Sequence, residues 1–281
     1  MFASQVDLKT TPRALEWDSA HFGDRVGEIP CPDLTDEQLF EVLIAAQANR
    51  YRLLYWSTSS GRYLPSLFDQ FGATPVNQRV VFVAALSGPD RPFHRGDAPA
   101  DAALDNDVCL EVVPRHPATD GLRDLAVMAG AHSRFCVDPR IPQERFQSLY
   151  CKWIDRSTKG EMADQVLVAK STAGRETGMI TMSVSGCVGQ IGLIAVHPNY
   201  RGRGIGSRLI SAAHKWFRAH DATRVNVVTQ LENRTACRLY ESWGYVPAEI
   251  RQWFHFWLGE SADTVDPSGD EWNRLEESRG V

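Results

Sequence analysis

The sequence has no long apolar run and no apolar leader segment. Its longest uninterrupted apolar run covers positions 80–86, far short of the roughly 18 residues that a membrane helix needs. The first residues, MFASQVDLKTTPRA, lack the apolar stretch of a signal peptide. We therefore expect no membrane span and a cytoplasmic location.

Closely spaced cysteines are also absent. The six cysteines occupy positions 31, 109, 136, 151, 187 and 237. Zinc sites usually pair cysteines two to four positions apart, and no such pair occurs here. We expect reduced, mostly buried thiols, with no metal and no disulfide.

Outside the C-terminus the chain has no net excess of positive or negative charge. The chain has 30 Lys and Arg and 35 Asp and Glu, a net charge of −5. Residues 259–281 contain seven acids and two bases, which accounts for the whole excess. The rest is neutral overall, which argues against a broad nucleic-acid surface and against a nucleic-acid partner.

Proline, glycine and aspartate gather at one place, residues 87–107, which we interpret as a linker. The expected organisation is an N-terminal α/β domain at 1–86, the linker at 87–107, a larger domain at 108–258, and an acidic flexible tail at 259–281. One short pattern occurs twice: Phe71-Gly72 and Trp243-Gly244 each separate a predicted helix from a predicted strand.

Periodicity predicts a mixed α/β fold. Helices are expected at 38–48, 64–71, 122–131, 143–155, 207–220 and 233–243. Strands are expected at 51–57, 79–86, 109–113, 165–169, 178–185, 190–196, 224–229 and 251–258. The aromatic strand at 251–258 either pairs with a second copy, giving a homodimer, or is a covered strand of the sheet.

The most informative stretch joins the strand at 190–196 to the helix that follows. It reads Arg201-Gly202-Arg203-Gly204-Ile205-Gly206, and Ser207 comes next. A helix N-terminus has unpaired N–H groups and a partial positive charge, and glycines allow close approach of an anion. The alternative, a plain glycine turn with two solvated arginines, leaves the alternating glycines without a purpose. The Walker lysine and the G-x-G-x-x-G pattern are absent.

This stretch resembles motif A of the GNAT acyltransferase superfamily, R-x-x-G-x-G/A. The resemblance covers about 150 residues and implies the GNAT fold, with a mixed central sheet splayed at the cofactor site. It implies that residues 201–207 hold the pyrophosphate of acetyl-CoA. It also implies that backbone groups of Ile194, Ala195 and Val196 bind the pantetheine arm.

A second resemblance to the family lies at Asn233 to Tyr245, which matches N-x-x-A-x-x-L-Y-x-x-x-G-F with tyrosine in the last place. It implies that Asn233 contacts the cofactor and that Tyr240 is the general acid for the departing thiolate. Two local alternatives stay open. Asn233 also suits a helix N-cap, and Tyr240 shares a helical face with apolar residues, where it would only pack the core.

The base that deprotonates the acceptor amine stays open among Glu111, His132, Glu161 and a water chain. His197 precedes a proline at a strand end and is interpreted as structural.

Residues 15–23, Ser133-Arg134-Phe135 and the aromatic helix after them resemble stretches of GNAT enzymes that acetylate dTDP-linked amino sugars. The resemblance implies a nucleotide-sugar acceptor, with Arg134 and Phe135 as substrate residues. A helix end with a favourably placed arginine explains Arg134 equally well. Acetylation of another amine, such as a peptide N-terminus, polyamine, amino acid or antibiotic, and a non-catalytic coenzyme A-binding module are the alternatives.

Overall fold

The computed structural model describes residues 11–59, 65–86 and 108–259. The chain divides into two units, one made of residues 1–75 and 254–281 and the other of residues 76–253. Two long strands, β4 (Ala73–Ala85) and β10 (Val246–Trp257), each contribute residues to both units. No helix in the described ranges combines the length and the apolarity needed to cross a membrane.

The first unit builds its sheet in the order β1-β2-β3-β10. Its strands are β1 (Arg13–Ala14), β2 (Val26–Glu28) and β3 (Leu53–Thr58), and its helices are α1 (Glu16–Phe22), α2 (Asp36–Ala48) and α3 (Pro65–Gln70). Helix α2 starts at a capping box in which the Thr35 hydroxyl accepts from the Gln38 N–H. Its apolar face is buried with Trp56 of β3.

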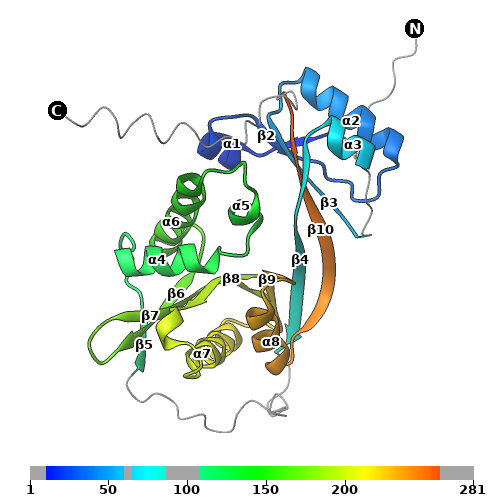
Figure 1. Cartoon of the computed structure of the whole chain (residues 1–281). Helices are drawn as coiled ribbons and strands as arrows, with labels where there is room; N and C mark the ends of the chain where they lie inside the picture. The colour runs from blue at the N-terminus through cyan, green and yellow to red at the C-terminus, as the bar shows by residue number, and fades with distance from the viewer. Residues whose placement is uncertain (1–10, 60–64, 87–107, 260–281) are drawn as a thin grey trace, which may run out of the picture. The chain divides into compact units, whose positions relative to one another are not determined.

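The second unit continues in the order β10-β4-β9-β8-β7-β6-β5 (Figure 1). Its further strands are β5 (Val108–Val112), β6 (Gln165–Ser171), β7 (Glu176–Ser185), β8 (Val188–Val196) and β9 (Arg224–Gln230). Its helices are α4 (Asp120–Ala129), α5 (Arg134–Val137), α6 (Gln143–Lys159), α7 (Ile205–Ala219) and α8 (Arg234–Ser242), with a 3₁₀ turn at Pro198–Tyr200.

Helices cover both faces of the second unit's sheet. Helices α4, α5 and α6 lie on one face and α7 and α8 on the other (Figure 1). The core between the sheet and α7 and α8 contains Phe82, Phe217 and Tyr240, each at most 2% exposed. Apolar residues at helical spacing in α7 face this core, as the sequence predicts.

The division of the chain differs from the one expected from the linker. Val80 to Ala85 of β4 pair with β9, so this part of the strand belongs to the second unit although it precedes residue 87. Composition marks a linker but carries no information on which strand a segment pairs with. The linker at 87–107, and the tail from residue 260 onward, lie outside the described residues.

The strand expected at 251–258 is neither an edge strand nor a free surface. Strand β10 lies between β3 and β4 in the sheet order, and Phe254 and Phe256 are at most 2% exposed. The pairing with a second copy that the aromatic pattern suggested is therefore wrong for this strand, since both of its edges are occupied. The cysteines also differ from expectation, because Cys109 and Cys187 are exposed.

Two stretches of the chain share one order of elements. One runs β2-α2-β3-α3-β4 and the other β8-α7-β9-α8-β10; β2 is parallel to β3, and β8 is parallel to β9. The final strand of each follows a glycine with positive φ, Gly72 at 59° and Gly244 at 76°. Helix α2 starts at Asp36 and Glu37, whose negative charges oppose anion binding, so only the second repeat has the features of a phosphate turn.

A buried histidine makes the stability of the second unit depend on pH. His214 of α7 is 1% exposed, and its Nε2 lies 2.8 Å from the Tyr245 hydroxyl. Burial, with a smaller effect of Arg218, lowers the pKa of His214 to about 4. A histidine in the unfolded chain has a pKa of about 6.5, so between these values the unfolded state binds the extra proton.

We therefore predict that the free energy of unfolding falls by about 2–3 kcal/mol through this group as the pH drops from about 6.5 toward 4. Urea unfolding at pH 7, 5.5 and 4.5 measures it. The variant His214→Gln keeps a polar side chain but cannot titrate, and should lose this part of the pH dependence. An equal decline in wild type and variant would contradict the prediction.

Candidate active site

Strands β8 and β9 separate part of the way along their length. Their parallel pairing runs from Val188 with Arg224 to Ile191 with Val227 and then stops, although β8 continues to Val196 and β9 to Gln230. A register shift between β7 and β8 occurs at the same level, between Ile180 and Met182. The two strands therefore bound a gap at their C-terminal ends.

The separation has a local cause in β8. The Leu193 N–H donates to the Thr181 hydroxyl at 2.8 Å instead of continuing the regular ladder. A Cβ at Gly192 would lie 2.7 Å from that hydroxyl oxygen. Glycine at this position therefore allows the bulge, which bends β8 away from its parallel neighbour.

Backbone groups of β8 face the gap. The His197 N–H donates to the Thr177 carbonyl at 2.8 Å, and Ala195 pairs with Met179 two residues earlier. Because an antiparallel ladder directs alternate residues to opposite sides, Ile194 and Val196 present their N–H and C=O groups away from β7, toward β9. Of the three residues predicted to bind the pantetheine arm, Ile194 and Val196 therefore face the gap, whereas Ala195 pairs with β7.

The predicted phosphate turn stands directly after β8. Gly202 has φ 77° and Gly204 has φ 75°, and Gly204 is the N-cap of the 15-residue helix α7. Both values lie in the left-handed region that glycine adopts without steric cost. The first N–H groups of α7, at Ile205, Gly206 and Ser207, have no partner within the helix and carry its positive dipole end.

The two arginines of the turn flank its backbone. Arg201 donates from Nε to the Val196 carbonyl at 3.1 Å, and the Arg203 guanidinium lies 5.1 Å from the centre of the Tyr200 ring. Both side chains are exposed, so they can reach phosphate oxygens. Gly206 has a packing role too, since a Cβ there would lie 3.2 Å from Leu239 of α8.

Tyr240 of α8 lies in the core beneath the sheet. It is 2% exposed, and its ring centre is 5.7 Å from those of Phe82 and Tyr245. Burial raises the pKa of Tyr240 well above its ordinary value, so the phenol stays protonated at neutral pH. Within the described residues no hydrogen bond to its hydroxyl is found. Tyr240 therefore packs in the core, as the alternative interpretation predicted, and its protonated hydroxyl is also a hydrogen-bond donor.

Asn233 is the N-cap of α8, because its Oδ1 accepts from the Ala236 N–H at 3.2 Å. This is the local role that the sequence suggested beside a cofactor contact. The residue follows β9 by three positions, at the end of the strand where the gap opens.

The candidate bases are separated by the fold. Glu111 lies on the edge strand β5 in an ion pair with Lys170 at 2.8 Å, and hydrogen bonds from Lys170 and Cys109 lower its pKa. Glu161 is paired with Arg156 at 2.9 Å. His132 alone among the three lies beside β4, where its carbonyl accepts from Asn77 Nδ2 at 3.1 Å.

The substrate residues predicted from the sequence lie at the start of α5. The Arg134 guanidinium is 4.8 Å from the centre of the Phe135 ring and 4.5 Å from that of Trp253 on β10. Helix α5 is a single turn of four residues, so Arg134 lies in its last turn as well as its first, and the helix-end role suggested as the alternative stays open.

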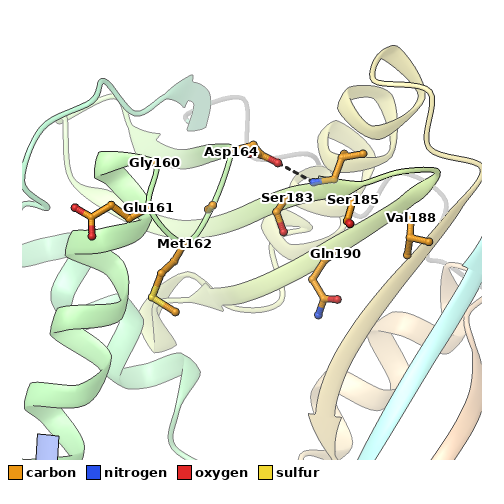
Figure 2. A pocket seen from close by; sticks show the side chains of 10 residues that line it. Gly160, Glu161, Met162, Asp164, Ser183, Ser185, Val188 and Gln190 are labelled. Carbon is orange, nitrogen blue, oxygen red and sulfur yellow. Dashed lines mark hydrogen bonds between the residues drawn. The ribbon is translucent and has the colours of Figure 1, made fainter. Parts of the chain in front are cut away.

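One cavity lies away from the turn. It has a volume of about 350 Å³ and is bounded by the loop after α6 and the β7–β8 hairpin (Figure 2). Its Asp164 carboxylate accepts from the Val184 N–H at 2.8 Å. Gln190 in its wall is six residues before Val196, about 20 Å along β8, so this acidic cavity is remote from the turn.

A second cavity, of about 340 Å³, lies at the end of β8 next to His197. It is bounded by the first turn of α4 and the β6–β7 turn, where Arg175 Nη2 is 3.5 Å from His197 Nε2.

Sequence reasoning missed three features of the site. The only sequence signal of the bulge at Gly192 and Thr181 is a glycine inside a predicted strand. The bond between His214 and Tyr245 joins residues 31 positions apart, with tyrosine in place of the motif's phenylalanine as the one hint. The approach of Trp253 to Arg134 had no sequence signal, since it depends on the path of β10.

Known proteins resemble this chain in sequence. The Acetyltransferase (GNAT) family matches residues 132–245. The chain is 28% identical over 145 residues to the dTDP-fucosamine acetyltransferase of Escherichia coli O6:H1, covering 51% of this chain and 62% of that protein. It is 26% identical over 160 residues to the spore coat polysaccharide biosynthesis protein SpsD of Bacillus subtilis, covering 54% and 53%. The matches thus span between half and two thirds of these relatives.

A shorter match, 32% identical over 72 residues, links 26% of this chain to 40% of N-alpha-acetyltransferase 30 of Saccharomyces cerevisiae.

Solved structures share the fold. A functionally unknown protein from Staphylococcus epidermidis aligns with a TM-score of 0.54 at 12% identity, covering 84% of this chain and 85% of that one. A tandem GNAT protein from the clavulanic acid biosynthesis pathway aligns with a TM-score of 0.51 at 15% identity, covering 85% and 77%. The solved structures show the fold, and the family match, whose range contains the gap and the glycine turn, identifies residues 132–245 as a GNAT domain.

Proposed function

We propose that the protein is an acetyl-CoA-dependent N-acetyltransferase that acetylates the amino group of a dTDP-linked amino sugar by direct transfer. The observation that carries the proposal is the gap between β8 and β9, which exposes unpaired backbone groups and leads to the glycine turn at 201–206. Acetyl-CoA, the acetyl donor of the GNAT family, supplies the activated acetyl group.

The chain offers donors along the length of such a cofactor. The N–H groups at the start of α7, with Arg201 and Arg203, suit the pyrophosphate. The outward-facing N–H and C=O groups of Ile194 and the N–H of Val196 suit the amides of a pantetheine arm, which pairs with them as an added strand would, whereas the Val196 carbonyl already accepts from Arg201. An N–H group of β8 aimed at the thioester oxygen stabilises the negative charge that develops there during transfer.

Tyr240 is proposed as the acid. As the acceptor nitrogen bonds to the acetyl carbon, the carbon–sulfur bond breaks and the sulfur requires a proton. A thiol has a pKa of about 8.5 and a free phenol about 10, and burial raises the pKa of Tyr240 further. The phenol is therefore fully protonated at neutral pH and stabilises the departing sulfur by hydrogen bonding or proton donation.

The acceptor amine must lose a proton before or during attack. His132 is the candidate base that lies beside β4, at the end where β9 borders the gap. The alternative that the sequence left open is a chain of water molecules. It is favoured because Glu111 and Glu161 are both engaged in ion pairs.

The sugar nucleotide is proposed as acceptor on two grounds. The relatives matched over 145 and 160 residues are named for amino-sugar acetylation and polysaccharide synthesis. Arg134 provides a cation and Phe135 an aromatic surface for a phosphate-bearing ligand. The alternative acceptor is a protein N-terminus, which the similarity to N-alpha-acetyltransferase 30 favours. A coenzyme A-binding module without turnover is the remaining alternative.

Coenzyme A release, measured with a thiol reagent, tests the proposal. Addition of a dTDP-linked 4-amino-4,6-dideoxyhexose should release one thiol per sugar acetylated. Release with peptides, polyamines or aminoglycosides alone would support the alternative acceptors. Tight acetyl-CoA binding with no release for any amine would support the non-catalytic module.

The variant Gly204→Val places a branched side chain at φ 75°, where an anion would approach the turn. We predict a rise of at least about tenfold in the KM for acetyl-CoA, since one lost phosphate contact of 1.5–3 kcal/mol corresponds to that factor or more. Gly186→Val is the matched control, because Gly186 also has positive φ, at 56°, but lies in the β7–β8 turn. Equal KM values for the two variants would exclude the turn as the pyrophosphate site.

The variant Tyr240→Phe keeps the ring in its contacts with Phe82 and Tyr245 and removes only the hydroxyl. We predict a fall in kcat of about 10²-fold, typical of a lost general acid, with little change in Tm. Tyr245→Phe is the control, since its buried hydroxyl is bonded to His214 and takes no part in the transfer. If Tyr240→Phe retains full kcat, the tyrosine has a packing role alone.

A further inference from the structure

Strand β8 has one residue more than β7 in the ladder that the two strands share. The register of the pairing shifts by one residue between Ile180 and Met182 of β7. Thr181, the residue between them, therefore faces two residues of β8, Gly192 and Leu193. Two residues opposite one is the pattern of a β-bulge, which is a specific feature of a sheet and not a defect.

The extra residue reverses the alternation of β8. Before the bulge, the side chain of Ile191 belongs to the core that contains α7, so the odd-numbered residues point to that side. After the bulge, the even-numbered residues Ile194 and Val196 pack against the same core. Backbone N–H groups alternate together with side chains. The bulge therefore decides that the N–H groups of Ile194 and Val196 face the gap, since in a strand without it they would face β7.

The Thr181 hydroxyl supplies the hydrogen bond that the bulge requires. The Leu193 N–H donates to Thr181 Oγ1 at 2.8 Å, and the two residues are 4% and 2% exposed. A bulge takes a residue out of the regular ladder, and a buried N–H left without an acceptor destabilises the fold. Because threonine is branched at Cβ, few rotamers are open to it, and its oxygen is held in one position.

Thr181 acts on the gap only through the backbone of β8. Its strand, β7, pairs with the edge of β8 opposite to the one that β9 pairs with, and its side chain is buried. A ligand between β8 and β9 therefore contacts β8 and not Thr181. The hydroxyl determines which backbone groups such a ligand meets, which is the effect of a positioning residue.

We propose that Thr181 is a positioning residue of the acetyl-CoA site, whose hydroxyl holds the bulge that turns the N–H groups of Ile194 and Val196 toward the pantetheine arm. This inference rests on the proposed function and extends it, because it gives a role to a residue outside both cofactor motifs. The turn at 201–206 has its shape from glycines with positive φ and from the start of α7. The pantetheine end of the cofactor should therefore depend on Thr181, and the pyrophosphate end should not.

Amide hydrogen exchange in the cofactor-free full chain tests the arrangement without turnover. Measured by NMR, the Leu193 N–H should exchange about tenfold more slowly than the Ile194 N–H, because it is bonded to Thr181 whereas that of Ile194 faces the gap. Addition of coenzyme A should slow the exchange at Ile194. The reverse order in the free protein, with Ile194 protected and Leu193 exchanging quickly, would overturn the proposal.

Two variants of the threonine separate its hydroxyl from its shape. Thr181→Val keeps the branched side chain without the hydroxyl, and Thr181→Ser keeps the hydroxyl. Titration calorimetry compares coenzyme A with adenosine 3′-phosphate 5′-diphosphate, the part of coenzyme A that lacks the pantetheine arm. Thr181→Val should weaken coenzyme A binding about tenfold, as loss of a hydrogen bond does, and leave the affinity for the fragment unchanged. Thr181→Ser should bind both ligands as the wild type does.

Thr158→Val is the matched control for a lost buried hydroxyl. Thr158 is 3% exposed, and its hydroxyl donates to the Asp155 carbonyl at 3.0 Å within α6. This variant should bind coenzyme A and the fragment with wild-type affinity. Wild-type affinity for coenzyme A in Thr181→Val, or an equal loss for coenzyme A and the fragment, would contradict the positioning role.

Steady-state kinetics separates this inference from the proposed function. With a dTDP-linked amino sugar as acceptor, Thr181→Val should lower kcat about tenfold, and Thr181→Ser should restore it to within about threefold of the wild type. Turnover with wild-type kcat and wild-type coenzyme A affinity in Thr181→Val would reject the positioning role and leave the function standing. Coenzyme A binding that depends on the Thr181 hydroxyl, in a protein that acetylates no amine, would support the positioning role and reject the function.

Discussion

The early end of the pairing between β8 and β9 is the constraint on which the site depends. A backbone N–H or C=O in a sheet normally has a partner, and an unpaired one inside a protein is costly. Strand β8 tolerates the loss because β7 pairs its other side before and after the bulge. The backbone groups of Ile194 and the N–H of Val196 are thereby left facing the gap, and a ligand with amide groups can take the place that β9 leaves.

The phosphate turn and the candidate acid share one packed core. Helix α7 starts at the turn and carries His214, whose ring nitrogen lies 2.8 Å from the hydroxyl of Tyr245, which follows α8. Leu239 of α8 packs against Gly206 in the first turn of α7. The turn at 201–206 and Tyr240 are therefore carried by two helices that pack directly on each other.

The contacts of Trp253 join more distant parts of the chain. Arg79, Arg134 and Trp253 come from three elements separated by long stretches of sequence, and strands β4 and β10 carry two of them. Both strands follow the repeated order of strand, helix and glycine that occurs in each unit. In the first unit the corresponding helix starts with acids, whose negative charges oppose anion binding.

The sequence alone predicted the mixed α/β class, the course of α6 and α7, the glycine turn and Tyr240, because each depends on periodicity or on a motif within some twenty residues. It identified Asn233 as a cap for the same reason. The unit boundary within β4, the interior position of β10, the bulge at Gly192 and the approach of Trp253 to two arginines were decided only by the tertiary structure. These features arise when strands distant in the chain pair in a particular register, and no local pattern encodes which strand becomes the neighbour of which.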